Sequence, residues 1–156
     1  MQKFKQNKII LIFTIFIAFN FSLELGVESF EKQKDGTYLA NIYMINDVPL
    51  AGFQLDLLPK GFFEILSITG GHGEKAGFNM SAGKKGTMLG FSFSGAVIEP
   101  AKTKRVSDNI LFTLSLKSLK TFNEKTEISF DAIMAGRGGE KINTSVVPFK
   151  LLNSKK

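Results

Sequence analysis

Cysteine and tryptophan are absent from this chain of 156 residues, and histidine occurs only once. Without cysteine the chain can form no disulfide, bind no metal through thiolates, use no cysteine nucleophile and carry no lipid on an N-terminal cysteine. The single histidine, His72, lacks the additional nitrogen or sulfur ligands that a zinc site needs. We therefore expect a domain held together by its hydrophobic core, with no metal and no other cofactor.

Motifs that carry catalysis are also missing. Residues 77–85, GFNMSAGKK, superficially resemble a phosphate-binding loop, but five residues separate its glycines and Lys85 stands where Ser or Thr must lie. No serine occupies a nucleophile-elbow pattern. The acidic residues are numerous enough for a glycosidase pair, yet most of them stand singly in turns or on outward strand positions. These observations predict a protein that is not an enzyme.

The first 22 residues differ from the rest of the chain. Lys3, Lys5 and Lys8 precede an apolar run of 11 residues, 9–19, and no acidic residue lies among them. A basic start followed by a short apolar run is typical of a secretory signal peptide, and the run is shorter than the roughly 20 residues that span a bilayer. We expect residues 1–22 to direct export, giving a secreted or periplasmic protein. The alternative is an uncleaved N-terminal membrane anchor.

Net charge does not indicate a nucleic-acid partner. Loss of residues 1–22 would lower the formal net charge from +6 to +3. The remaining lysines are scattered along the sequence and are not interleaved with aromatic residues, which favours an ordinary solvated surface. After residue 22 no apolar run approaches membrane length. We expect neither nucleic acid nor membrane as a partner once the signal is removed.

Alternation of apolar and polar residues dominates the chain after residue 22. This period of two is typical of β-strands with one buried face, and no convincing helical period is present. Gly, Pro, Asn, Asp or Lys clusters separate the segments, so the pattern predicts an all-β fold, an antiparallel two-sheet sandwich rather than a small closed barrel. The segments are 36–46, 52–58, 62–69, 87–95, 109–117, 126–134 and 145–152.

The alternation also predicts which side chains face the core. Phe53, Leu55 and Leu57 share one face of the segment 52–58. In the segment 87–95 we expect Leu89, Phe91 and Phe93 to face inward, and in the last segment Val147, Phe149 and Leu151. Gly90 within its strand suggests a bulge or a close backbone approach, and Pro148 suggests an edge strand or a bulge.

The outward positions form a candidate recognition surface, whose alternative is an ordinary solvated sheet face. Its residues are Gln54, Asp56, Ser92 and Ser94. A carbohydrate-binding surface would normally present a flat row of Trp or Tyr. Tyr38 and Tyr43, the only tyrosines, lie five residues apart and so on opposite faces of one strand.

Residues 46–98 carry a series of glycine-centred features in a definite order. Gly52-Phe53-Gln54 opens a strand, Gly70-Gly71 ends the next, and a Gly77-Phe78 step precedes the strand Gly-Phe-Ser-Phe at 90–93. With the segments DNILFTLSLK and EISFDAIMAGRGGEKI, this order resembles the cohesin-type domain family of exported bacterial proteins, and the likeness covers residues 36–151. The chain departs from the family at 58–61, where Leu-Pro-Lys-Gly replaces a frequent Tyr-Asp-Pro turn.

The resemblance implies a jelly-roll sandwich of about nine strands and a non-catalytic role. It further implies an exported protein partner, of the calcium-loaded dockerin type, bound through one exposed sheet face. The alternative is a carbohydrate-binding module associated with polysaccharide degradation or the cell envelope. The corresponding domain organisation is a signal peptide at 1–22, a lead-in at 23–35, the sandwich at 36–152 and a tail at 153–156.

Overall fold

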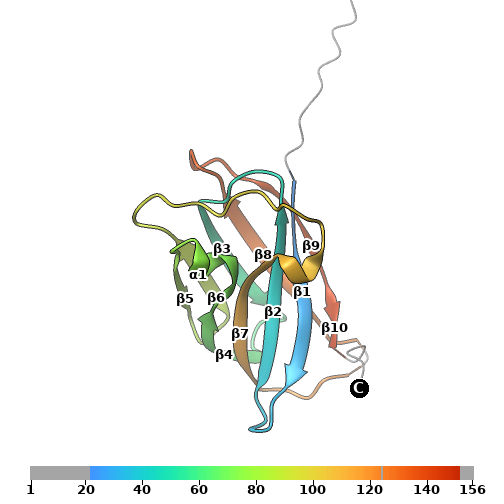
Figure 1. Cartoon of the computed structure of the whole chain (residues 1–156). Coiled ribbons are helices and arrows are strands. Elements are labelled where there is room, and N and C mark those ends of the chain that lie inside the picture. The colour runs from blue at the N-terminus through green and yellow to red at the C-terminus, as the bar shows by residue number, and fades with distance from the viewer. Residues whose placement is uncertain (1–21, 124, 152–156) are drawn as a thin grey trace, which may run out of the picture.

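The computed structural model describes residues 22–123 and 125–151, which form two five-stranded sheets packed face to face (Figure 1). Sheet I has the strand order β4-β7-β2-β1-β9. Its strands are β1 (Ser22–Lys32), β2 (Tyr38–Asn46), β4 (Phe63–Thr69), β7 (Ile110–Ser118) and β9 (Asn143–Val147). Neighbouring strands of sheet I pair antiparallel except β1 and β9, which are parallel.

Sheet II has the strand order β10-β8-β3-β6-β5, and all its pairs are antiparallel. Its strands are β3 (Gly52–Leu58), β5 (Asn79–Ala82), β6 (Thr87–Phe91), β8 (Glu127–Ala135) and β10 (Phe149–Lys150). A short helix α1 (Gly71–Lys75) and a 3-10 turn η1 (Val106–Asp108) lie in the connections. The expected all-β jelly-roll sandwich is confirmed, with ten strands in place of about nine.

Pro148 accounts for one additional strand. It divides the expected last segment into β9 at the edge of sheet I and β10 at the edge of sheet II. Proline has no N–H to donate to a ladder, so an edge position is the one it tolerates. Val147, expected to face inward, is 42% exposed, and Val146 packs against the core instead.

The sandwich begins before the expected residue 36. Residues 22–32, mostly assigned to a lead-in, form β1, which lies between β2 and β9 in sheet I. Leu23 and Leu25 of this strand are fully buried. The expected signal peptide, apart from Ser22, and the expected tail at 153–156 lie outside the described residues. Within the described range, no helix is long and apolar enough to span a membrane.

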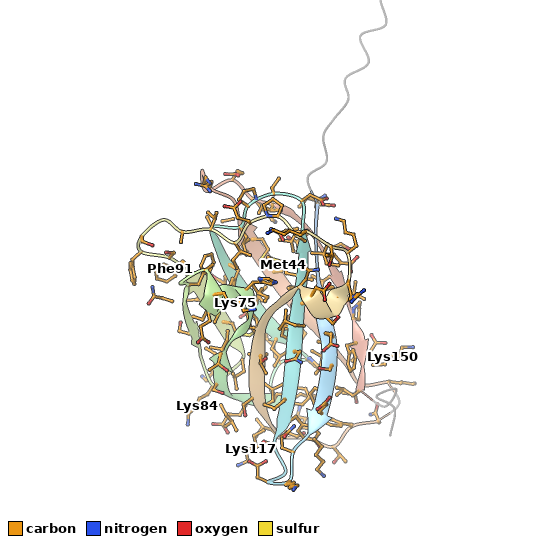
Figure 2. The ribbon with its side chains drawn as sticks, viewed as in Figure 1. Met44, Lys75, Lys84, Phe91, Lys117 and Lys150 are labelled. Atoms are coloured by element: carbon orange, nitrogen blue, oxygen red, sulfur yellow. The ribbon has the colours of Figure 1, made fainter. Side chains whose placement is uncertain are left out.

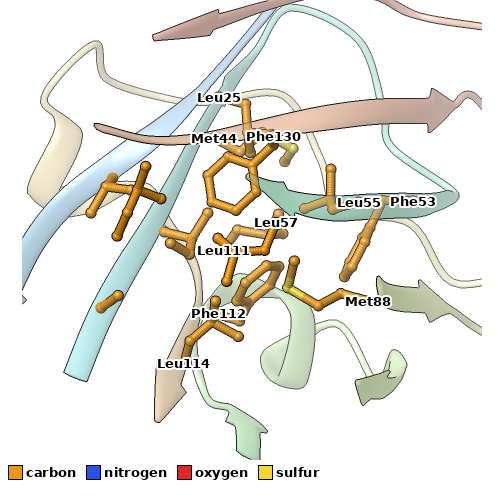
Figure 3. Packing of buried hydrophobic residues seen from close by; sticks show 14 of the residues in the cluster. Leu25, Met44, Phe53, Leu55, Leu57, Met88, Leu111, Phe112, Leu114 and Phe130 are labelled. Carbon is orange, nitrogen blue, oxygen red and sulfur yellow. The ribbon is translucent and has the colours of Figure 1, made fainter. Parts of the chain in front are cut away.

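The core lies between the two sheets and is built from their inward-facing strand positions (Figure 3). Phe53 of β3 packs against Phe112 of β7, with ring centroids 5.5 Å apart, and so joins sheet II to sheet I. Phe78, which precedes β5, also stacks on the Phe53 ring, with centroids 6.4 Å apart. Leu55 and Leu57 are buried as expected.

Strand β6 presents the opposite face from the one expected. Met88 is fully buried and Gly90 is buried, whereas Leu89 and Phe91 face outward and Phe93 lies beyond the end of the strand. Gly90 pairs directly with Phe53 of β3, and the Phe53 ring occupies the space where a Cβ on residue 90 would lie. The ladder is regular at Gly90, so the expected bulge is absent, and the group that approaches is the Phe53 side chain and not a backbone. The inward position of Gly90 reverses the expected faces of the strand.

Gly90→Ala should destabilise the fold, because the added methyl group overlaps a phenyl ring that Phe78 and Phe112 hold in place. Overpacking of this kind costs about 1–3 kcal/mol in the free energy of unfolding. Urea denaturation measures the loss. Gly83→Ala is the matched control, since the nearest atom to its Cβ is 3.7 Å away. A Gly90 variant as stable as the Gly83 variant would contradict the packing described.

Truncation should locate the start of the domain. Residues 22–156 are expected to fold, whereas residues 36–156 lose β1 and with it four buried apolar side chains, Leu23, Leu25, Val27 and Phe30. Each is worth about 1.5–3 kcal/mol, so their sum approaches or exceeds the stability of most domains. Circular dichroism with thermal melting distinguishes the two chains. A cooperative transition for 36–156 would refute the place given to β1.

Candidate functional site

The centre of the outer face of sheet I is polar, and several of its polar groups are hydrogen-bonded to one another, whereas Leu39 and Leu66 are exposed on strands of the same sheet. The Thr113 hydroxyl donates to Asn41 Oδ1 at 2.7 Å, and Asn41 Nδ2 donates to Ser29 Oγ at 3.0 Å. These bonds link three adjacent strands, β7, β2 and β1. Groups already paired within the sheet offer little to a partner, because binding would have to replace bonds already present.

Tyr43 extends this network on the same face. Its hydroxyl donates to Glu24 Oε1 at 2.8 Å, and its ring lies over Gly26, where a Cβ would be only 2.7 Å from Cε1. Burial, the hydrogen bond to Glu24 and the charge of that carboxylate together raise the pKa of Tyr43 to about 12. The tyrosine therefore stays protonated and packed flat against the sheet.

The outer face of sheet II carries an exposed apolar patch, which we define as Leu89, Phe91, Phe93 and Ile133. Their exposed fractions are 40, 42, 82 and 53%. Gln54 of β3 is paired with Leu89 of β6 on one side and with Ile133 of β8 on the other, so the patch crosses three strands. The rings of Phe91 and Phe93 are in contact, with centroids 4.9 Å apart. Gln54 separates Leu89 from Ile133, so the contiguous part of the patch is the pair Phe91 and Phe93. Exposed apolar side chains gathered on one face make it a candidate interaction surface.

A pair of carboxylates borders the patch. Asp56 of β3 lies directly opposite Asp131 of β8, one outward position along from Gln54 and Ile133. Asp56 accepts a hydrogen bond from the Thr87 hydroxyl at 2.5 Å, and Lys60 Nζ lies 3.8 Å from its Oδ2. Like charges opposite one another destabilise a sheet unless a cation lies between them. Lys60 offsets one of the two charges, and no described cation is ion-paired with Asp131, so the face combines an apolar part with one net negative charge.

The structure separates the four residues predicted for recognition. Gln54 is exposed and Asp56 half-buried, both on the outer face of β3. Ser92 and Ser94 lie in the turn beyond β6, with their hydroxyl oxygens 2.9 Å apart. The four do not form one cluster.

Sequence reasoning missed the apolar patch because it assigned Leu89, Phe91 and Phe93 to the core. Ile133 was missed as well, although it alternates with the expected inward positions of the segment 126–134. The signal that could have found the correct face is Met88-x-Gly90, an apolar residue and a glycine two positions apart opposite a phenylalanine-bearing strand. A glycine beneath a cross-strand aromatic ring is a recognised device of antiparallel sheets.

A concave region of about 400 Å³ lies apart from the two sheet faces, between α1 and residues 97–109. Its polar groups are largely paired with one another. His72 Nε2 lies 2.9 Å from the Asp108 carbonyl oxygen, and Thr103 donates to the Asp108 carboxylate at 3.0 Å. Nearby, the Lys104 ammonium donates to Asp47 at 2.8 Å and lowers the pKa of that carboxyl. Among the described residues, no three His, Asp or Glu side chains converge as metal ligands would.

Comparison with solved structures supports the fold reached above. The non-cellulosomal cohesin from the hyperthermophilic archaeon Archaeoglobus fulgidus is 12% identical, with a TM-score of 0.52 over 83% of this chain and 90% of that one. A type I cohesin–dockerin complex from Clostridium thermocellum gives 12% identity and a TM-score of 0.51, over 83% of this chain and 94% of that one. No family model and no curated protein matches the sequence. The chain has a cohesin-like fold, and at this identity the likeness concerns the fold alone.

Tyr43→Phe should change how stability depends on pH. An unfolded tyrosine ionises near pH 10, whereas folded Tyr43 keeps its proton to about pH 12, so the folded state loses stability as pH rises between these values. The variant should lack this loss, and at pH 8 it should be about 1–3 kcal/mol less stable through the missing bond to Glu24. Urea denaturation of both proteins at pH 8 and pH 11 gives the comparison. If the difference in unfolding free energy between the two proteins were the same at pH 8 and pH 11, the raised pKa of Tyr43 would be contradicted.

Proposed function

We propose that this protein is a non-catalytic docking module that binds another protein through the outer face of sheet II. The observation that supports this most directly is the apolar patch, which crosses β8, β3 and β6 and includes two aromatic rings in contact, whereas the centre of the other outer face is occupied by its own hydrogen bonds. Burial of exposed apolar side chains is the main source of affinity in protein association. The partner would be expected to present an apolar surface of its own.

The partner is of the dockerin type, calcium-loaded and exported, as the cohesin-like fold suggests. The Clostridium thermocellum structure with this fold is a cohesin–dockerin complex. The pair Asp56 and Asp131 adds a preference of its own, for a basic side chain placed beside the apolar part of the partner. Export rests on the N-terminal signal pattern at 1–22.

The geometry of the aromatic residues disfavours the carbohydrate alternative. The rings of Phe91 and Phe93 meet at 81°, edge to face, so they do not form the flat platform on which sugar rings stack. Tyr43, which could have extended such a platform, is 5% exposed and lies on sheet I.

Substitutions on the two faces test the proposal against a panel of dockerin modules. Leu89→Ser with Phe91→Ser should weaken binding about 30-fold or more, since loss of one buried interface anchor costs about 2 kcal/mol. Leu39→Ser with Leu66→Ser is the matched control, because these leucines are 39 and 49% exposed on sheet I. Biolayer interferometry with the full chain immobilised, in calcium and in chelator, measures the affinities.

Binding lost in the sheet II variant, kept in the control and abolished by chelator is the expected result. Equal affinity of the two variants would exclude the outer face of sheet II. Affinity unaffected by chelator would exclude a calcium-loaded partner while leaving the face itself supported.

A further inference from the structure

The lysines that are scattered in the sequence gather at one end of the folded domain. Four connections meet there, namely the β1–β2, β3–β4, β5–β6 and β7–β8 turns. Figure 2 shows Lys84 and Lys117 at this end, away from Phe91. We call it the basic end. Its lysines are Lys32, Lys34, Lys60, Lys84, Lys85, Lys117, Lys120 and Lys125.

The charge of the domain is segregated along its length. The basic end is made up of residues 31–37, 59–64, 83–86, 117–123 and 125–126, which hold eight lysines and three acidic residues. The other described residues hold seven basic and ten acidic residues. A domain that is nearly neutral as a whole therefore presents a strongly positive end, which attracts anions over the range of the Debye length.

An apolar cleft of about 430 Å³ opens at the basic end, between the β3–β4 and β5–β6 turns. Lys60, Lys84 and Lys85 surround it, and Phe63 and Leu119 line it together with the lysine stems. Among the described residues that line it, Glu64 is the one acidic residue. The Glu64 carboxylate lies 3.4 Å from Lys84 Nζ, and Lys60 Nζ lies 3.8 Å from the Asp56 carboxylate, so two of the three lysines already form ion pairs. Both lysines are largely exposed, and ion pairs of exposed lysines are weak, so both can turn to an anionic ligand.

Leu119 is held at the rim of this cleft with its side chain 54% exposed. Its backbone N–H donates to the Phe62 carbonyl oxygen at 2.8 Å, which ties the β7–β8 connection to the β3–β4 turn. Lys120, the next residue, lies 5.0 Å from the centre of the Phe62 ring. The rim therefore presents an apolar side chain directly beside ammonium groups.

We propose that this cleft binds an anionic phospholipid. Its apolar lining accepts the start of an acyl chain beside Leu119, and Lys60, Lys84 and Lys85 hold the phosphate. The combination of an apolar cleft with positive charge fits an amphiphile better than a hydrophilic polyanion, which has nothing to place in the cleft. All the basic residues of this end are lysines, which are compact point charges suited to phosphate without bidentate geometry.

Amide chemical shifts of the full chain during lipid titration test this. The probes are dihexanoyl-phosphatidylglycerol, its neutral phosphatidylcholine analogue, inorganic phosphate and polyphosphate, with the lipids below their micelle concentrations. The anionic lipid should shift the amides of Lys84, Lys85 and Leu119 and bind about tenfold more tightly than the neutral lipid. The readout is specific for each residue, so any association of residues 9–19 with lipid is observed separately.

Two variants separate the contributions of charge and apolar contact. Replacement of Lys60, Lys84 and Lys85 by Gln should remove the preference for the anionic headgroup, whereas replacement of Lys102, Lys104 and Lys141 by Gln, at the opposite end, should not. Leu119→Ser should weaken the binding of both lipids. Equal affinity for the two lipids would overturn the proposal. The proposal would also be overturned if phosphate or polyphosphate produced the same amide shifts and Leu119→Ser left those shifts unchanged. That result would identify a polyanion site.

Discussion

The contact between the Phe53 ring and Gly90 determines which side of β6 faces the core. Because a strand has a period of two, this one contact places Met88 inside and Leu89 and Phe91 outside. The β3–β6 neighbours on the outer face of sheet II follow from that register, including Gln54 opposite Leu89. The separate β3–β8 register places Ile133 on the other side of Gln54. The same ring also packs on Phe112, so the contact that sets the face of β6 joins the two sheets as well.

Both sheets use an aromatic ring over a glycine, with opposite consequences for their outer faces. In sheet I the ring of Tyr43 lies over Gly26 on the outside, and its hydroxyl completes a bond to Glu24, so the surface is closed and polar. In sheet II the ring lies on the inside, and the residues displaced outward are apolar. The difference gives the domain one face satisfied by its own groups and one face able to gain free energy on association. The basic end, with the cleft beside Leu119, is a third surface, joined to the outer face of sheet II by the ion pair of Lys60 with Asp56.

Much of this architecture could be predicted from the sequence, because alternating segments such as 52–58 and 126–134 have only one apolar phase. The segment 87–95 could not be resolved this way. The face with Leu89, Phe91 and Phe93 carries more apolar residues than the face with Met88 and Gly90. Only the pairing of Gly90 with Phe53 reveals that the second face is the inward one. β1 was missed as a strand of the domain because it directly follows the signal-like segment. The lysines appeared scattered because turns distant in sequence meet only in the fold.

The absence of cysteine from the chain makes a direct measurement of the central claim possible, namely that the outer face of sheet II is open and is covered by a partner. The measurement is the rate of thiol labelling of Leu89→Cys, with Met88→Cys and Leu66→Cys as references for the core and for sheet I. We expect rapid labelling at positions 89 and 66 of the free protein, slow labelling at 88, and protection of 89 but not of 66 in the complex. Slow labelling at 89 in the free protein, or an unchanged rate there with the partner bound, would contradict an open sheet II face that a partner covers.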